Sequence, residues 1–185
     1  MKKKAFLIHG WEGHPEHGWW PWLKNKLEKE GFSVFVPAMP DTNHPKMDAW
    51  VNHLTKIVET PNKDCYFVGH SLGCITILRY LETLKLNENI GGAVLVAGFS
   101  DDLEFKELDS FFTKSIDWKK IKAHCKKIVA IHSDNDPYVP LKHGDIFKEK
   151  LGVELIVQHN MKHFSGDDGI IELPVALESV LKISE

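Results

Sequence analysis

The chain has 185 residues, of which 43% are hydrophobic and 26% are charged, and its formal net charge is −3. This length suits one globular domain over residues 1–185 and is too short for two ordinary ones. Because the charge balance is slightly acidic, the chain offers no basic field to attract nucleic acid or an anionic membrane, and we expect neither as a partner.

Short apolar runs alternate with longer amphipathic segments along the chain. In chain order, we expect strands at residues 5–8, 32–36, 65–69, 93–98, 127–132 and 153–157, and helices at 19–30, 46–59, 73–86, 117–124, 141–150 and 172–183. Near-continuous apolar strands are typical of a parallel sheet that is covered on both faces. The alternation therefore predicts an open, doubly wound α/β fold. Residues 99–116 follow no regular pattern and either cap a pocket or cross the surface.

A G-x-S-x-G pattern, Gly69-His-Ser-Leu-Gly73, follows the third predicted strand. Ligands of open parallel sheets bind at the carboxyl ends of the strands, and this pattern lies at such an end. Two glycines let a strand turn abruptly into a helix, which leaves the hydroxyl of Ser71 exposed above the sheet. The alternative is a turn of small residues with no chemical role. We favour Ser71 as a nucleophile.

A serine nucleophile needs a base, and the base needs an orienting acid. In hydrolases whose chain order is serine, then aspartate or glutamate, then histidine, the acid and the histidine each follow a later strand. Asp134 and Asp136 both come after the strand at 127–132, and we favour Asp136 because the prolines that follow it make a rigid loop. His159 and His163 both come after the strand at 153–157, and we favour His163 for its longer reach.

The oxyanion of an acyl-transfer reaction needs two backbone N–H donors. We expect one at Leu72, directly after the nucleophile, and the other at Trp11, in the loop after the first strand. The histidines of the N-terminal third allow a different interpretation, a metal site. Its candidate ligands match no familiar zinc spacing, so we expect no metal. They are His9, His14, His17, Asp41 and His44.

Four further residues stand at the ends of predicted strands. We expect His70, Phe99, Tyr138 and Phe164 to line a substrate pocket. His132, inside an apolar strand, is expected to be a core histidine instead.

The expected compartment is the cytoplasm. No segment reaches the ~20 apolar residues of a membrane span, and the apolar run at 5–8 is too short for a secretory signal. The three cysteines form no C-x-x-C pair, and two of them lie in apolar runs, as reduced buried thiols do. They are Cys65, Cys74 and Cys125.

These features together resemble the α/β-hydrolase superfamily, and more narrowly the small serine hydrolases related to retinoblastoma-binding protein 9. The resemblance spans nearly the whole chain. It rests on GHSLG, on the later DNDPYVP and His163-Phe164 segments, on Met39-Pro-Asp41 before a Trp-containing helix, and on Asp117-Trp118 before a strand. One departure is Lys162, where many relatives have glycine; a lysine there would alter the loop backbone or bring a cation near the base.

The resemblance implies a compact α/β-hydrolase of about six parallel strands flanked by helices, without a large lid domain. It also implies a Ser71–His163–Asp136 triad and carboxylesterase-type activity on small ester or related acyl substrates, with no cofactor. The chain lacks the L-x-C-x-E pattern associated with retinoblastoma pocket proteins, so that partner is not carried over. The alternative function is a hydrolase-like binding module with a silent triad.

Overall fold

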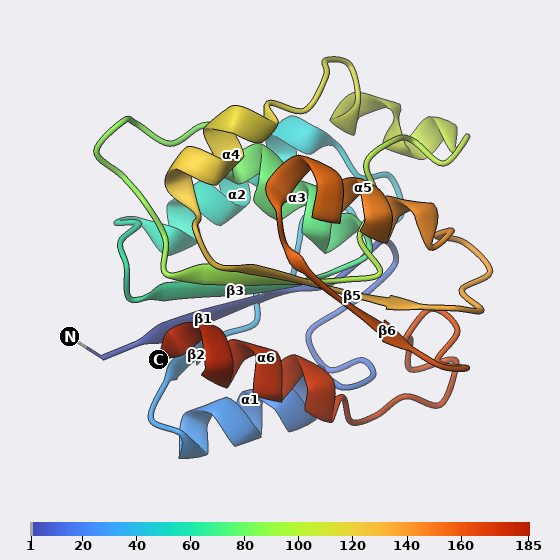
Figure 1. Ribbon diagram of the computed structural model, residues 1–185, viewed down its shortest axis with the longest axis horizontal. Helices are drawn as coiled ribbons and strands as arrows, with labels where there is room; N and C mark the ends of the chain where they lie inside the picture. Colours follow the sequence, from blue (N-terminus) through green and yellow to red (C-terminus); the bar gives the residue numbers. More distant parts are fainter. Residues whose placement is uncertain (1) are drawn as a thin grey trace.

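The computed structural model describes residues 2–185. Its centre is a single sheet in which every strand runs parallel to its neighbours (Figure 1). In chain order the strands are β1 (Lys4–Ile8), β2 (Ser33–Phe35), β3 (Cys65–His70), β4 (Gly92–Val96), β5 (Ile128–Ser133) and β6 (Glu154–Gln158). All six overlap the apolar runs of the sequence, and the predicted α/β fold is confirmed.

Helices cover both faces of the sheet (Figure 1). One face carries α1 (Trp20–Lys29) and α6 (Pro174–Ser184), and the other carries α2 (Met47–Val58), α3 (Leu72–Leu81), α4 (Trp118–His124) and α5 (Lys142–Leu151). Each face therefore has its own core. Phe67 belongs to the core beneath α2 and α3, and its neighbour Val68 belongs to the core beneath α1 and α6. This is the alternation that successive strand residues impose.

The order of the strands across the sheet is β2-β1-β3-β4-β5-β6. The direction in which the chain builds the sheet reverses between β1 and β3, which are direct neighbours. In sheets of this kind the crevice at the carboxyl ends of the two strands beside the reversal is the usual place for a ligand. The crevice here lies between His9, just after β1, and His70, the last residue of β3.

Helix α3 differs from its prediction in two respects. It ends at Leu81 rather than at residue 86, and all ten of its residues are buried, so it is not amphipathic. Arg79 is buried because the carboxylate of Glu82 accepts its hydrogen bonds at 2.9 and 3.0 Å. The guanidinium also donates to backbone carbonyl oxygens of the segment that follows β4. A charge that is paired in this way can be buried, which a hydropathy pattern does not reveal.

The segment at 99–116 is a short excursion over the carboxyl end of the sheet. It contains a 3₁₀ helix, η1 (Lys106–Phe111), which buries Leu108 and Phe111. Leu103, Phe105 and Leu108 of this excursion line the pocket that lies beside Ser71. Within residues 2–185 no helix is long and apolar enough to span a bilayer.

Candidate active site

Ser71 occupies a strained turn between β3 and α3. Its backbone angles are φ 53° and ψ −119°, a conformation that residues other than glycine seldom adopt. The N–H of Ser71 donates to the carbonyl oxygen of Val96 at 2.9 Å, which anchors the turn to β4. Strain of this kind persists only where the surrounding structure determines it, and it is concentrated at functional sites.

The two glycines of G-x-S-x-G are required by close packing. A Cβ on Gly73 would collide with the carbonyl oxygen of Ile8, and a Cβ on Gly69 would lie 2.8 Å from the amide nitrogen of Cys74. Both positions therefore exclude a side chain. The motif lets α3 start directly against the end of β1, which brings Ser71 beside the loop that follows that strand.

Asp136 and His163 meet although they are 27 positions apart in the chain. The Nδ1–H of His163 donates to Oδ2 of Asp136 at 2.8 Å, and the Asp136 side chain is only 2% exposed. The other carboxylate oxygen, Oδ1, accepts the backbone N–H groups of Tyr138 and Val139 at 2.9 and 3.0 Å. The carboxylate is thus held on both oxygens, and the imidazole leaves Nε2 free to accept a proton.

The two alternatives at the sequence level, Asp134 and His159, also pair, at 2.6 Å, but on the surface. The His159 side chain is 80% exposed, and neither residue lines the pocket. Asp134 serves to hold the loop, because its Oδ1 accepts the N–H of Asn160 at 2.9 Å. The N–H of Asn160, and then His159, lower the pKa of the Asp134 carboxyl.

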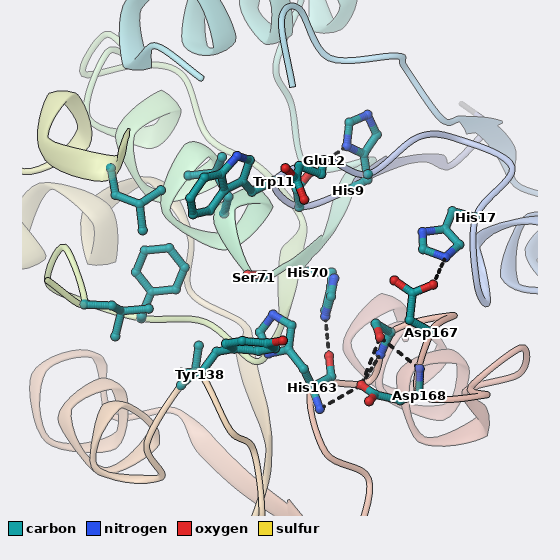
Figure 2. A pocket seen from close by; sticks show the side chains of 18 of the residues that line it. His9, Trp11, Glu12, His17, His70, Ser71, Tyr138, His163, Asp167 and Asp168 are labelled. Carbon is teal, nitrogen blue, oxygen red and sulfur yellow. Dashed lines mark hydrogen bonds and ion pairs between the residues drawn. The ribbon is translucent and has the colours of Figure 1, made fainter. Parts of the chain in front are cut away.

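Ser71 and His163 line the same pocket, which has a volume of about 400 Å³. In the described residues no hydrogen bond joins their side chains. Figure 2 shows Trp11 above and Tyr138 below Ser71, and His17, Asp167 and Asp168 together to its right. The pocket therefore has an apolar flank and a polar flank. Its apolar part is extended by Phe99, Leu103, Phe105 and Leu108.

The pocket residues expected from the sequence divide into two groups. His70, Phe99 and Tyr138 line the pocket. Phe164 does not: it is fully buried in the core beneath α1 and α6, and its carbonyl oxygen accepts the indole N–H of Trp19 at 2.8 Å. The left-handed backbone at Phe164, φ 56°, turns its side chain inward, which its position after a strand did not indicate.

Trp11 and Leu72 also line the pocket, one from each side of the strand-order reversal. Within residues 2–185 neither backbone N–H has a hydrogen-bond partner. His9 fixes the loop that carries Trp11: its Nε2 accepts the N–H of Met39 at 3.0 Å, and its Nδ1–H donates to the carbonyl oxygen of Gly10 at 2.9 Å. Burial lowers the pKa of His9 and keeps the ring neutral in this arrangement.

His70 lines the pocket as predicted, but one of its ring nitrogens is used within the protein. Its Nε2 lies 2.6 Å from the carbonyl oxygen of His163, so this nitrogen carries the ring proton and donates it. Burial, and then the neighbouring His163, lower the pKa of His70 to about 3. His70 is therefore neutral in the physiological range of pH.

Asp168 is a pocket residue that the sequence interpretation missed. Its Oδ2 accepts the N–H groups of His163 and Ser165 at 3.1 and 3.2 Å, and the Ser165 hydroxyl accepts the Asp168 N–H at 3.1 Å. This reciprocal pairing is that of a capping box, and the S-x-x-D spacing was its available signal. Although burial raises it, these hydrogen bonds hold the pKa of the Asp168 carboxyl below its usual value.

The candidate metal ligands do not converge. His44 pairs with Asp41 at 3.4 Å, His17 lies 3.6 Å from Asp167, and His9 is occupied as described above. In the described part of the chain no group of three or more histidine, cysteine or acidic side chains is placed to hold a metal ion. His132 is buried in β5, as expected, and its Nε2–H donates to the carbonyl oxygen of Gly98.

The sequence pattern of the family described as serine hydrolase matches residues 5–182, nearly the whole chain. The chain belongs to the serine hydrolase family. Among curated relatives, the putative hydrolase YdeN of Bacillus subtilis is 33% identical over 179 residues, which cover 96% of this chain and 94% of YdeN. The serine hydrolase RBBP9 of Rattus norvegicus is 28% identical, with 89% of each chain covered.

Solved structures show the same fold. The crystal structure of the ydeN gene product of B. subtilis superposes with a TM-score of 0.93 at 32% identity, covering 98% of each chain. Est1E of Butyrivibrio proteoclasticus, solved with ferulic acid bound, gives a TM-score of 0.77 at 15% identity, covering 97% of this serine hydrolase and 87% of Est1E. At that identity Est1E is evidence for the α/β-hydrolase fold alone.

Proposed function

We propose that this serine hydrolase is a carboxylesterase that cleaves small esters through a triad of Ser71, His163 and Asp136. The observation that carries the proposal is the buried 2.8 Å hydrogen bond between His163 and Asp136, beside a serine in a strained strand-to-helix turn. A buried carboxylate that accepts two backbone N–H groups and also orients an imidazole is typical of a catalytic histidine, and a surface or packing histidine does not require one.

The first half of the reaction forms an acyl-enzyme. The Oγ of Ser71 attacks the ester carbonyl carbon, and Nε2 of His163 takes the hydroxyl proton. Asp136 holds the imidazole through Nδ1–H and stabilises the imidazolium that forms. The resulting oxyanion is bound by the unpartnered N–H groups of Trp11 and Leu72. When the tetrahedral intermediate collapses, His163 returns the proton to the alkoxide, which leaves as the alcohol.

The second half regenerates the enzyme. A water molecule enters the position vacated by the alcohol, and Nε2 of His163 takes one of its protons as the water oxygen attacks the acyl carbon. The Ser71 ester bond breaks, the proton passes to Oγ, and the carboxylic acid is released. No step requires a metal or a cofactor.

The shape of the pocket supports small substrates. Its volume of about 400 Å³ is at the lower end of the range for small-molecule sites, about 300–1,000 Å³. The apolar flank built by Phe99, Leu103, Phe105 and Leu108 suits a short acyl chain. A short acyl ester is therefore the best-fitting substrate class.

The proposal is tested with p-nitrophenyl esters of increasing acyl length, from acetate to palmitate, and with Ser71→Ala as the control. We expect kcat/KM to be highest for acyl chains of about two to eight carbons, and activity to be lost in Ser71→Ala. A preference for palmitate would contradict the substrate class. No turnover of any ester by folded protein would favour the silent binding module instead.

A further inference from the structure

The loop that carries His163, between β6 and α6, has an unusual backbone. Lys162 and Phe164, on either side of His163, have φ angles of +46° and +56°. Position 162 therefore has a backbone conformation that suits glycine, and Lys162 needs support to keep it. Residues other than glycine keep such angles only where surrounding contacts determine them. Two side chains provide contacts of this kind to the peptide groups of His163 itself.

The first side chain is His70, which immediately precedes Ser71. Its Nε2–H donates to the carbonyl oxygen of His163 at 2.6 Å, and the two rings lie with their centroids 4.8 Å apart (Figure 2). The hydrogen bond therefore joins the end of β3 to a loop 93 residues later in the chain. Because His70 and Ser71 are adjacent in the chain, the bond links the turn that holds the nucleophile to the backbone of the base.

The second side chain is Asp168. Its Oδ2 accepts the N–H of His163 at 3.1 Å and also binds both the N–H and the hydroxyl of Ser165 (Figure 2). The Asp168 side chain is only 16% exposed, and Nζ of Lys162 lies 3.7 Å from its Oδ1. The cation of Lys162 thus pairs with Asp168 at this loop. Together, His70 and Asp168 hold the carbonyl and the amide of the same residue.

We propose that His70 and Asp168 are positioning residues that hold His163 at its working distance from Ser71. The inference rests on the proposed function. The hydrogen bond to Asp136 restrains the imidazole at one atom, and by itself it leaves the ring some freedom to pivot. Fixing both peptide groups removes this freedom. A displacement of about 1 Å in a catalytic group can cost about 10²-fold in rate.

The type of residue at position 70 follows from the same geometry. A lysine or arginine could donate to the His163 carbonyl, but it would place a permanent cation beside an imidazole that becomes charged during the reaction. A neutral histidine donates the same hydrogen bond without opposing that charge. The low pKa of His70, about 3, keeps its ring neutral in the physiological range of pH.

The proposal is tested with matched pairs of variants. His70→Leu removes the donor at similar volume, and His70→Gln restores an N–H at similar reach. We expect His70→Leu to lower kcat about 100-fold with KM within about threefold, and His70→Gln to stay within about tenfold of the wild type. Asp168→Ala and Asp168→Asn should form a parallel pair. The control is His44→Leu, because His44 is 77% exposed and lies outside the pocket.

The second readout is the rate at which a fluorophosphonate probe labels Ser71, which reports on nucleophile and base without a bound ester. It should fall in parallel with kcat in His70→Leu and recover in His70→Gln. Thermal melting identifies any variant that does not fold, and the Asp168 pair then carries the test. Unchanged kcat in folded His70→Leu, or equal loss in the leucine and glutamine variants, would overturn the proposal. Absence of labelling in the wild type would instead contradict the proposed esterase function, on which the positioning role rests.

Discussion

Four consecutive residues, Ser133 to Asp136, each make a different contact with the loop that carries His163. The Ser133 hydroxyl accepts the N–H of Met161 at 3.0 Å, and the Asn135 side chain accepts the N–H of Lys162 at 2.8 Å. Asp134 accepts the N–H of Asn160, and only Asp136 of the four contacts the imidazole of His163. The two aspartates look equivalent in the sequence, but only Asp136 is buried against the imidazole of His163.

Replacing each aspartate by asparagine separates these two roles. Asp136→Asn removes the charge and favours the wrong tautomer of His163, and we expect kcat to fall by about 10⁴-fold. Asp134→Asn keeps an oxygen acceptor for the Asn160 N–H, and we expect kcat to change by less than about threefold. Steady-state kinetics on one ester, with folding checked by circular dichroism, measures both. Equal losses in the two variants would contradict the assignment of Asp136 as the acid.

At the scale of elements, α3 both positions Ser71 and anchors the wall of the pocket. Its buried Arg79 donates to the carbonyl oxygens of Phe111 and Lys114 at 2.8 and 2.7 Å, and Glu82 accepts the N–H of Asp117 at 2.7 Å. The excursion that supplies Leu103 and Phe105 to the pocket is thus fixed at its far end by an ion pair at the C-terminus of α3. The helix that begins at the nucleophile also fixes the apolar flank.

Removing one partner of this ion pair should lower the free energy of unfolding more than replacing both partners. Arg79→Met leaves the buried Glu82 carboxylate without the guanidinium and with only Nζ of Lys114, 3.8 Å away, to pair with it. We expect a loss of about 3–5 kcal/mol in the free energy of unfolding. The double variant Arg79→Met with Glu82→Leu should recover part of that loss. Urea denaturation of the wild type, both single variants and the double variant gives the cycle. A double variant as unstable as the sum of the single variants would contradict direct coupling between the two residues.

At the scale of the whole molecule, most of the fold could be predicted because it depends on patterns that are local in sequence. The apolar runs predicted the positions of the strands, and Gly69 and Gly73 indicated the strand-to-helix turn at Ser71. The failures depend on polar contacts and on backbone conformation, which a pattern of apolar residues does not record. The burial of Arg79 needs Glu82 and three carbonyl groups, the inward turn of Phe164 needs a left-handed backbone, and Asp168 matters only because His163 lies beside it.

The most direct test of the central claim, that Ser71 is an activated nucleophile, is labelling with a fluorophosphonate probe followed by intact mass measurement and peptide mapping. We expect a single adduct on Ser71 in the wild type, no adduct in Ser71→Ala, and labelling slowed by at least about 10³-fold in His163→Ala. The His163→Ala variant distinguishes activation by the base from mere exposure of the hydroxyl. Absence of an adduct on folded wild-type protein, or equally fast labelling without His163, would contradict the triad.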